Sequence, residues 1–108
     1  MYELISIRVG EQEFCIDVQS VREIRGWTAE SPMPHASEYL RGVVNHRGVV
    51  LPIIDLGHRL GFAATTPSAR HAIVVVEANS RMLGLVVDAV SDIFKASDEE
   101  IQAVPDAA

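Results

Sequence analysis

The apolar residues of this chain fall into short runs, and turn-forming residues separate one run from the next. From Leu4 to Val9 apolar and polar positions largely alternate, and the apolar pattern resumes at 14–16 after the segment 10–13. Alternation over so few residues is typical of a strand, and a short Gly-containing break between two strands is typical of a hairpin. We therefore expect residues 4 to 16 to form a β-hairpin.

The next segment changes its period before it returns to a strand. The apolar positions 18, 21 and 24 lie three residues apart, which predicts a single helical turn capped by Asp17. The chain is expected to extend again near Ile24. The proline-rich segment 31–37 then predicts a connection, because residues that precede proline favour extended backbone.

The stretch YLRGVVNHRGVVLPIIDL, residues 39–56, holds two apolar runs on either side of the polar tetrad at 45–48. A link of this length predicts a second hairpin, in which Gly48 supplies the positive φ angle that such turns need. Pro52 lacks a backbone N–H and therefore predicts a sheet edge or a bulge in the second strand.

The rest of the chain continues in the same manner. Residues 56–62 predict a short helical turn, and 63–70 predict a loop of small and polar residues. The apolar runs on either side of Asn79-Ser80-Arg81 predict a third hairpin. Ser97–Glu100 places acidic residues where the first turn of a helix would carry them. Short strands with turn residues between them indicate a single all-β domain, most simply a barrel.

Composition narrows the class of protein. Asp and Glu outnumber Lys and Arg by 15 to 9, the net charge is -6, and no basic block occurs, which argues against nucleic acid as a partner. The N-terminus lacks the features of a signal peptide, and no apolar run reaches the roughly 20 residues of a membrane span. We expect a cytoplasmic protein that does not insert into membranes. Cys15 is the only cysteine, and its apolar neighbours predict a buried, inert thiol.

Residues that carry chemistry are few and scattered. His46, Asp55 and His58 are the candidates for a metal site, but their spacing enforces no convergence, so we favour solvated turn histidines. The common nucleotide-binding and hydrolase motifs are absent, and no serine or cysteine has a motif partner that would activate it. We therefore expect no catalytic activity, metal or cofactor.

Several polar and aromatic residues have more than one interpretation. Asp88 is expected to accept hydrogen bonds from a neighbouring turn or to pair with an arginine. Trp27 either covers part of the core or anchors a partner. Val21 and Glu23 have the spacing of strand residues on one face. Arg47 is either a solvated turn residue or a fork for a carboxylate on a partner.

Four blocks in this order resemble the CheW family of bacterial chemotaxis coupling proteins. They are VREIRG at 21–26, YLRGVVNHRGVVLPIIDLGHRLG at 39–61, IVVVEANSRMLGLVVDAVSDI at 73–93, and IQAVP at 101–105. The resemblance implies one CheW-like domain over residues 1–108, built from two small five-stranded SH3-like barrels that pack together. It also implies a non-enzymatic adaptor, without cofactor, that joins the cytoplasmic tips of chemoreceptors to the regulatory domain of the histidine kinase CheA.

The family's motif also implies roles for individual residues. The receptor-facing residues are expected to be Val21, Glu23 and Arg47. The residues expected to shape the hairpin that presents Arg47 are Gly42, Asn45 and Gly48.

This sequence departs from the family in two respects. His46 stands where the family usually has an apolar residue, commonly Leu, and a histidine there would tune receptor choice or add sensitivity to pH. Family members also continue past the 101–105 motif into another strand pair, so the closing strands of the second barrel are expected to be missing. An unpaired strand edge then predicts either a strand-sharing homodimer or a shortened chain of marginal stability.

Two alternatives stay open at this point. One is a CheW-like module of a different signalling pathway, such as one that governs surface motility or development. The other is a small enzyme or metal-binding domain that uses His46, Asp55 and His58.

Overall fold

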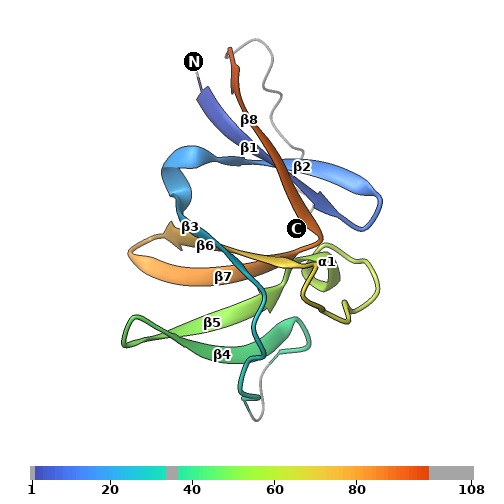
Figure 1. Ribbon diagram of the computed structural model, residues 1–108, viewed down its shortest axis with the longest axis vertical. Helices are drawn as coiled ribbons and strands as arrows, with labels where there is room; N and C mark the ends of the chain where they lie inside the picture. The colour runs from blue at the N-terminus through green and yellow to red at the C-terminus, as the bar shows by residue number, and fades with distance from the viewer. Residues whose placement is uncertain (1, 34–36, 98–108) are drawn as a thin grey trace.

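The chain folds into two β-sheets that lie one beyond the other along the long axis of the molecule (Figure 1). The computed structural model describes residues 2–33 and 37–97. The elements in chain order are β1 (Tyr2–Val9), β2 (Gln12–Asp17), the 3-10 turn η1 (Val18–Ser20), β3 (Val21–Gly26), β4 (Leu40–His46), β5 (Val49–Asp55), α1 (Leu56–Arg59), β6 (Ala72–Ala78), β7 (Arg81–Val87) and β8 (Ala89–Ala96).

The smaller sheet has the strand order β2-β1-β8 and contains the N-terminal hairpin. β1 and β2 pair antiparallel around a turn in which Gly10 has a φ of 62°. The hairpin predicted for residues 4 to 16 is therefore confirmed. The predicted helical turn follows it as η1, where the Asp17 side chain accepts a hydrogen bond from the Gln19 backbone N–H at 2.9 Å. The chain is extended again from Val21, three residues earlier than expected.

The larger sheet has the strand order β3-β6-β7-β5-β4. β6 and β7 are joined by a two-residue turn in which Asn79 and Ser80 both have positive φ angles. This geometry suits the right-handed twist of the strands, and it confirms the third predicted hairpin. β5 and β7 pair in parallel, which no local pattern in the sequence indicates.

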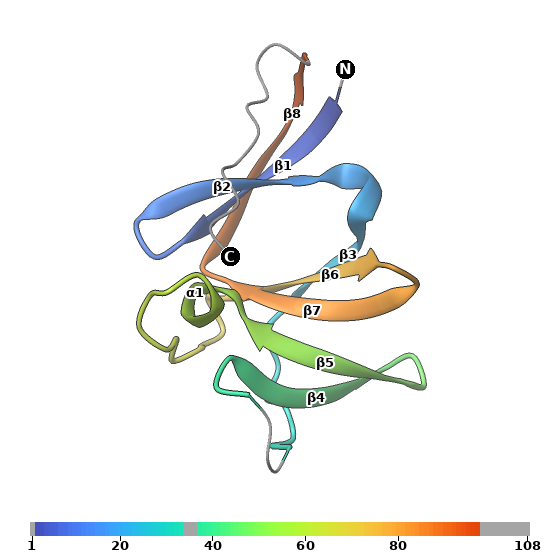
Figure 2. The same cartoon turned by 180° about the vertical axis from the view of Figure 1, so that it is seen from behind.

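The larger sheet closes into a barrel because the chain that follows one edge strand, β3, pairs with the other edge strand, β4. The chain that leaves β3 returns to β4, where Ser31 and Val43 exchange backbone hydrogen bonds of 2.8 and 2.9 Å (Figures 1 and 2). Gly42 makes this approach possible, because a Cβ there would overlap the carbonyl oxygen of Ser31. The all-β, barrel-like fold class is confirmed. This unit has five strands, and the other has three in the described part of the chain.

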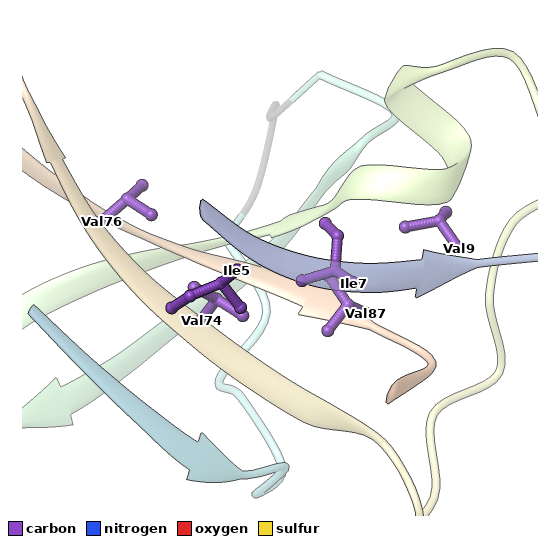
Figure 3. Packing of buried hydrophobic residues seen from close by; sticks show 6 residues of the cluster. All are labelled: Ile5, Ile7, Val9, Val74, Val76 and Val87. Atoms are coloured by element: carbon purple, nitrogen blue, oxygen red, sulfur yellow. The ribbon is translucent and has the colours of Figure 1, made fainter. Parts of the chain in front are cut away.

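Two hydrophobic clusters lie on opposite faces of β6. Ile73 and Val75 belong to the cluster inside the barrel, and Val74 and Val76 belong to the cluster between the sheets. Figure 3 shows the second cluster, in which β6 and Val87 pack against β1 residues. A strand that is covered on both faces has no polar face, which explains the unbroken apolar run at 73–76. Each fully buried Val or Ile side chain contributes about 1.5 to 3 kcal/mol to stability.

Two predictions about single residues were wrong. Cys15 is exposed, because its neighbours Phe14 and Ile16 on β2 take the positions that pack against the inter-sheet cluster. Pro52 lies in β5, an inner strand with β7 on one side and β4 on the other. Its missing N–H is tolerated because the pairing with β7 begins only at Ile53.

Other polar positions behave as the sequence predicts. The short helical turn is present as α1, and Asp88 accepts a hydrogen bond from Gly10 N–H in the β1–β2 turn at 3.1 Å. Trp27 covers part of the barrel core and donates to a Glu30 carboxylate oxygen at 3.1 Å. Residues 98–105, on which most of the predicted helix start and the IQAVP motif fall, lie outside the described residues. Within residues 2–33 and 37–97, no helix has the length and apolar character to cross a bilayer.

Candidate functional site

The hairpin between β4 and β5 turns more tightly than the sequence suggests. His46 pairs with Val49, so the turn contains only Arg47 and Gly48 rather than the whole tetrad at 45–48. Both turn residues have positive φ, 53° and 81°, as a two-residue turn of this hand requires. The Asn45 side-chain oxygen accepts a hydrogen bond from Gly48 N–H at 2.9 Å, which holds the turn closed.

Arg47 at this turn meets Glu23 from β3. An Arg47 guanidinium nitrogen lies 3.0 Å from Glu23 Oε1, and the Arg47 side chain is 78% exposed. The two residues stand 24 positions apart in the sequence, Glu23 on the edge strand β3 and Arg47 in the turn that follows the opposite edge strand β4. They meet only because the barrel closes.

His46 is not the solvated turn histidine that the sequence analysis favoured. It is the last residue of β4, it is buried, and both of its ring nitrogens have polar neighbours from β3. An Arg25 guanidinium nitrogen lies 3.0 Å from Nδ1, and Glu23 Oε2 lies 2.9 Å from Nε2. The contact with Glu23 is close but not aligned as a hydrogen bond, so that buried carboxylate oxygen has no aligned donor among the described residues.

These side chains form the rim of a groove of about 320 Å³. Its charged and polar lining comes from β3 and the β4–β5 turn, and its apolar lining comes from β5 and β7. The lining residues are Arg22, Glu23, His46, Arg47, Val49, Leu51 and Met82. Val49 is 53% exposed, so the groove presents apolar surface to solvent, whereas its neighbour Val50 does not line the groove, because successive residues of β5 point to opposite faces. An apolar floor with a charged rim is typical of a protein-binding surface.

Two of the residues assigned by resemblance lie elsewhere. Val21 is half-buried against the inter-sheet cluster and does not line the groove. Gly42 lies inside β4, opposite Ile53 and against Ser31, so it shapes the closure of the barrel rather than the turn.

Sequence reasoning missed several residues of the groove. It also missed Arg25, which contacts His46 without lining the groove; its spacing from Glu23 along β3 is the one signal that could have placed both on the same face. Met82 comes from the distant strand β7, and no local pattern connects it to the hairpin.

The alternative of a metal site at His46, Asp55 and His58 finds no support in the geometry. His46 and Asp55 lie at opposite ends of the β4–β5 hairpin, and the seven residues from Val49 to Asp55 extend for about 20 Å in a strand. Asp55 is buried and is occupied with hydrogen bonds from the backbone of His58 and from Thr65. Within the described ranges, no group of three His, Cys, Asp or Glu side chains is placed to hold a metal ion.

Comparison with known proteins gives consistent results. A family model described as a CheW-like domain matches residues 3–108. The chain is 58% identical over 106 residues to the chemotaxis protein CheW of Rhizobium meliloti, covering 98% of this chain and 68% of that protein. It is 55% identical over 104 residues to the probable chemotaxis protein CheW of Rhizobium etli, covering 96% of this chain and 67% of that protein.

A solved structure extends the comparison to three dimensions. The crystal structure of the scaffolding protein TtCheW from Thermoanaerobacter tengcongensis superposes with a TM-score of 0.91 at 26% identity, covering 99% of this chain and 73% of that one. Its fold therefore matches nearly every residue of this chain. With a family model over residues 3–108 and a relative of 58% identity, the chain belongs to the CheW-like family.

Proposed function

We propose that this chain is a non-enzymatic adaptor that couples the cytoplasmic tips of chemoreceptors, the methyl-accepting chemotaxis proteins, to the histidine kinase CheA. The observation that carries the proposal is the similarity along almost the whole chain to proteins named for chemotaxis and scaffolding. An adaptor acts by holding two partners in a defined geometry, and its chemistry is that of its surfaces.

The receptor surface in this proposal is the groove rimmed by Glu23 and Arg47. Apolar side chains from β5 and β7 line the groove, so they offer the buried contact that dominates the energy of most interfaces. Arg47 keeps most of its guanidinium exposed while it touches Glu23, and its remaining donors face solvent. A receptor carboxylate at that position would therefore find a planar fork of donors. Val21 packs against the inter-sheet cluster and lies outside this groove, so the proposed receptor surface rests on Glu23, Arg47 and the apolar lining.

The proposal is tested by measuring how the chain binds a receptor-tip fragment and, separately, the regulatory domain of CheA. Arg47→Glu is expected to weaken receptor binding by about 1 to 3 kcal/mol, roughly 5- to 150-fold, because it reverses the charge at a partly buried polar contact. Glu23→Lys tests the other side of the same rim. Binding of CheA is expected to stay within about twofold, since the proposal assigns this groove to the receptor.

Two controls separate a lost receptor contact from a disturbed chain. Arg70→Glu makes the same charge change at an exposed arginine outside the groove and is expected to leave receptor binding unchanged. The double variant Glu23→Arg with Arg47→Glu restores an internal ion pair with its charges exchanged, and it is expected to bind the receptor as weakly as Arg47→Glu. Wild-type affinity in Arg47→Glu would reject the assignment of the groove to the receptor.

A further inference from the structure

His46 is the most unusual residue of the groove, because it is a buried polar side chain to which the proposed adaptor function assigns no role. It is 9% exposed at the end of β4 and lies directly under the turn that carries Arg47. Buried polar groups in folded proteins nearly always have hydrogen-bond partners. The groups that contact its two ring nitrogens therefore indicate the role of His46.

The Arg25 contact determines which ring nitrogen carries the proton. A guanidinium group can only donate hydrogen bonds, so His46 Nδ1, 3.0 Å away, must accept. A histidine that accepts at Nδ1 is neutral and carries its proton on Nε2. The protonated Nε2 then lies 2.9 Å from Glu23 Oε2, a buried oxygen with no aligned hydrogen-bond donor among the described residues, so the two groups meet as a close polar contact.

Glu23 in turn connects the ring to the surface. Its Oε2 faces His46, and its Oε1 lies 3.0 Å from the Arg47 guanidinium. The contacts therefore form a chain in which Arg25 contacts His46, His46 contacts Glu23, and Glu23 contacts the largely exposed Arg47. We propose that His46 is a positioning residue, which orients the Glu23 carboxylate from beneath so that Glu23 and Arg47 present one fixed arrangement of charge to the receptor. This inference rests on the proposed function, in which these two residues meet the receptor.

The arrangement is sensitive to a second proton on the ring. Protonation turns Nδ1 from an acceptor into a donor that faces a guanidinium, so the Arg25 hydrogen bond is lost and two like charges adjoin. The cationic ring then competes with Arg47 for the Glu23 carboxylate. The charged groups around His46 are Glu23 and Arg25 from β3 and Arg47 from the turn, with Arg22 on the same groove. The groove residues from β5 and β7 are uncharged.

The first test uses the free protein and needs no receptor. Nitrogen-15 NMR of the imidazole is expected to show the tautomer protonated at Nε2 near neutral pH. In the wild type, the NMR chemical shift of the Glu23 side-chain carboxyl carbon is expected to change together with the signals of the His46 ring as the pH is varied. In His46→Gln this change is expected to be absent. Two results would overturn the proposal even if receptor binding is normal: a His46 ring protonated at Nδ1, or a Glu23 chemical shift that responds to pH in the same way in the wild type and in His46→Gln.

The second test measures the affinity of the wild type, His46→Gln and His46→Leu for a receptor tip, together with its dependence on pH. In His46→Gln an amide can still present an N–H to Glu23, so this variant should lose less affinity than His46→Leu, whose apolar side chain offers no donor. Protonation of His46 is expected to weaken wild-type binding, and this pH dependence should be absent from both variants. A wild-type affinity in His46→Leu, or a pH dependence that persists in it, contradicts the inference.

Failure of the proposed function looks different from failure of this inference. If wild-type protein binds no receptor tip at any pH, the adaptor proposal fails, while the NMR titration still decides whether His46 orients Glu23. CheA binding, measured over the same pH range, serves as the control and is expected to show no step that depends on His46.

Discussion

The β4–β5 hairpin carries a polar cluster at each end, and the two clusters differ in how completely their acidic side chains are satisfied. At the α1 end, Asp55 is 1% exposed and accepts three hydrogen bonds, from His58 N–H, Thr65 N–H and the Thr65 hydroxyl. At the turn end, the Glu23 side chain is 31% exposed, and one of its oxygens lacks an aligned donor.

The difference shows which end is suited to a partner. A carboxylate whose oxygens already accept hydrogen bonds within its own protein has little ability to accept more from another molecule. Removing such a carboxylate leaves several buried donors without a partner. A pair such as Glu23 and Arg47 contributes little to folding because one member is largely exposed to water. Its charges remain available for recognition. The α1 end therefore stabilises the barrel, and the turn end presents a surface.

The largest expected effect is at the α1 end, in the close approach of Ser31 to β4. Gly42→Ala should lower the free energy of unfolding by about 3 kcal/mol or more, because the new Cβ overlaps backbone of Ser31 at a φ of 150°. Urea denaturation measures this loss. Gly10→Ala is the matched control, since Gly10 also has a positive φ but no atom within 4 Å of a new Cβ. It should cost about 1 to 2 kcal/mol. Equal losses in the two variants would remove the steric explanation.

A matched pair of amide substitutions compares the two acidic side chains directly. Asp55→Asn should cost about 2 to 3 kcal/mol, because both Asp55 oxygens accept hydrogen bonds and an amide N–H₂ must then face a donor. Glu23→Gln should cost less than about 1 kcal/mol, since Gln keeps an acceptor for Arg47. Thermal and urea unfolding of the two variants supply the comparison. Receptor binding should show the reverse order, and a larger stability loss in Glu23→Gln would contradict the division between the two ends.

The smallest expected effect is in the turn itself. Asn45→Ala removes the hydrogen bond to Gly48 N–H at an exposed position and should cost about 0.5 to 1 kcal/mol. Asn45→Asp keeps the acceptor and should cost less. If both variants unfold like the wild type, the Asn45 side chain does not hold the turn, and the orientation of Arg47 depends on its ion pair alone.

Local structure could be predicted well from the sequence because it depends on neighbouring residues. The turn at Asn79–Ser80 and the cap at Asp17 follow from residue types whose backbone preferences act within a few positions. The prediction of burial failed where it required knowing which face of a strand packs against the core. Cys15 has apolar neighbours on both sides, and only the pairing of β2 with β1 decides that Phe14 and Ile16 face the core while Cys15 faces water.

The candidate site was predicted in part. The resemblance named Glu23 and Arg47, and the structure brings these two within 3.0 Å of each other. It assigned His46 no partners and did not mention Arg25, because those contacts depend on two strands at opposite edges of a sheet. Val21 and Gly42 belong to the same motifs, yet they pack elsewhere.

By itself, the sequence determined most of the strands, the positions of the hairpin turns, the apolar run of β6 and the resemblance to the family, since each depends on short stretches of residue types. Only the tertiary structure decided that β3 and β4 would meet, with Ser31 paired to Val43 and Glu23 beside His46 and Arg47. The physical reason is that closing a barrel joins residues that are far apart in the chain. The free energy of that closure comes from the buried cluster as a whole rather than from any local pattern.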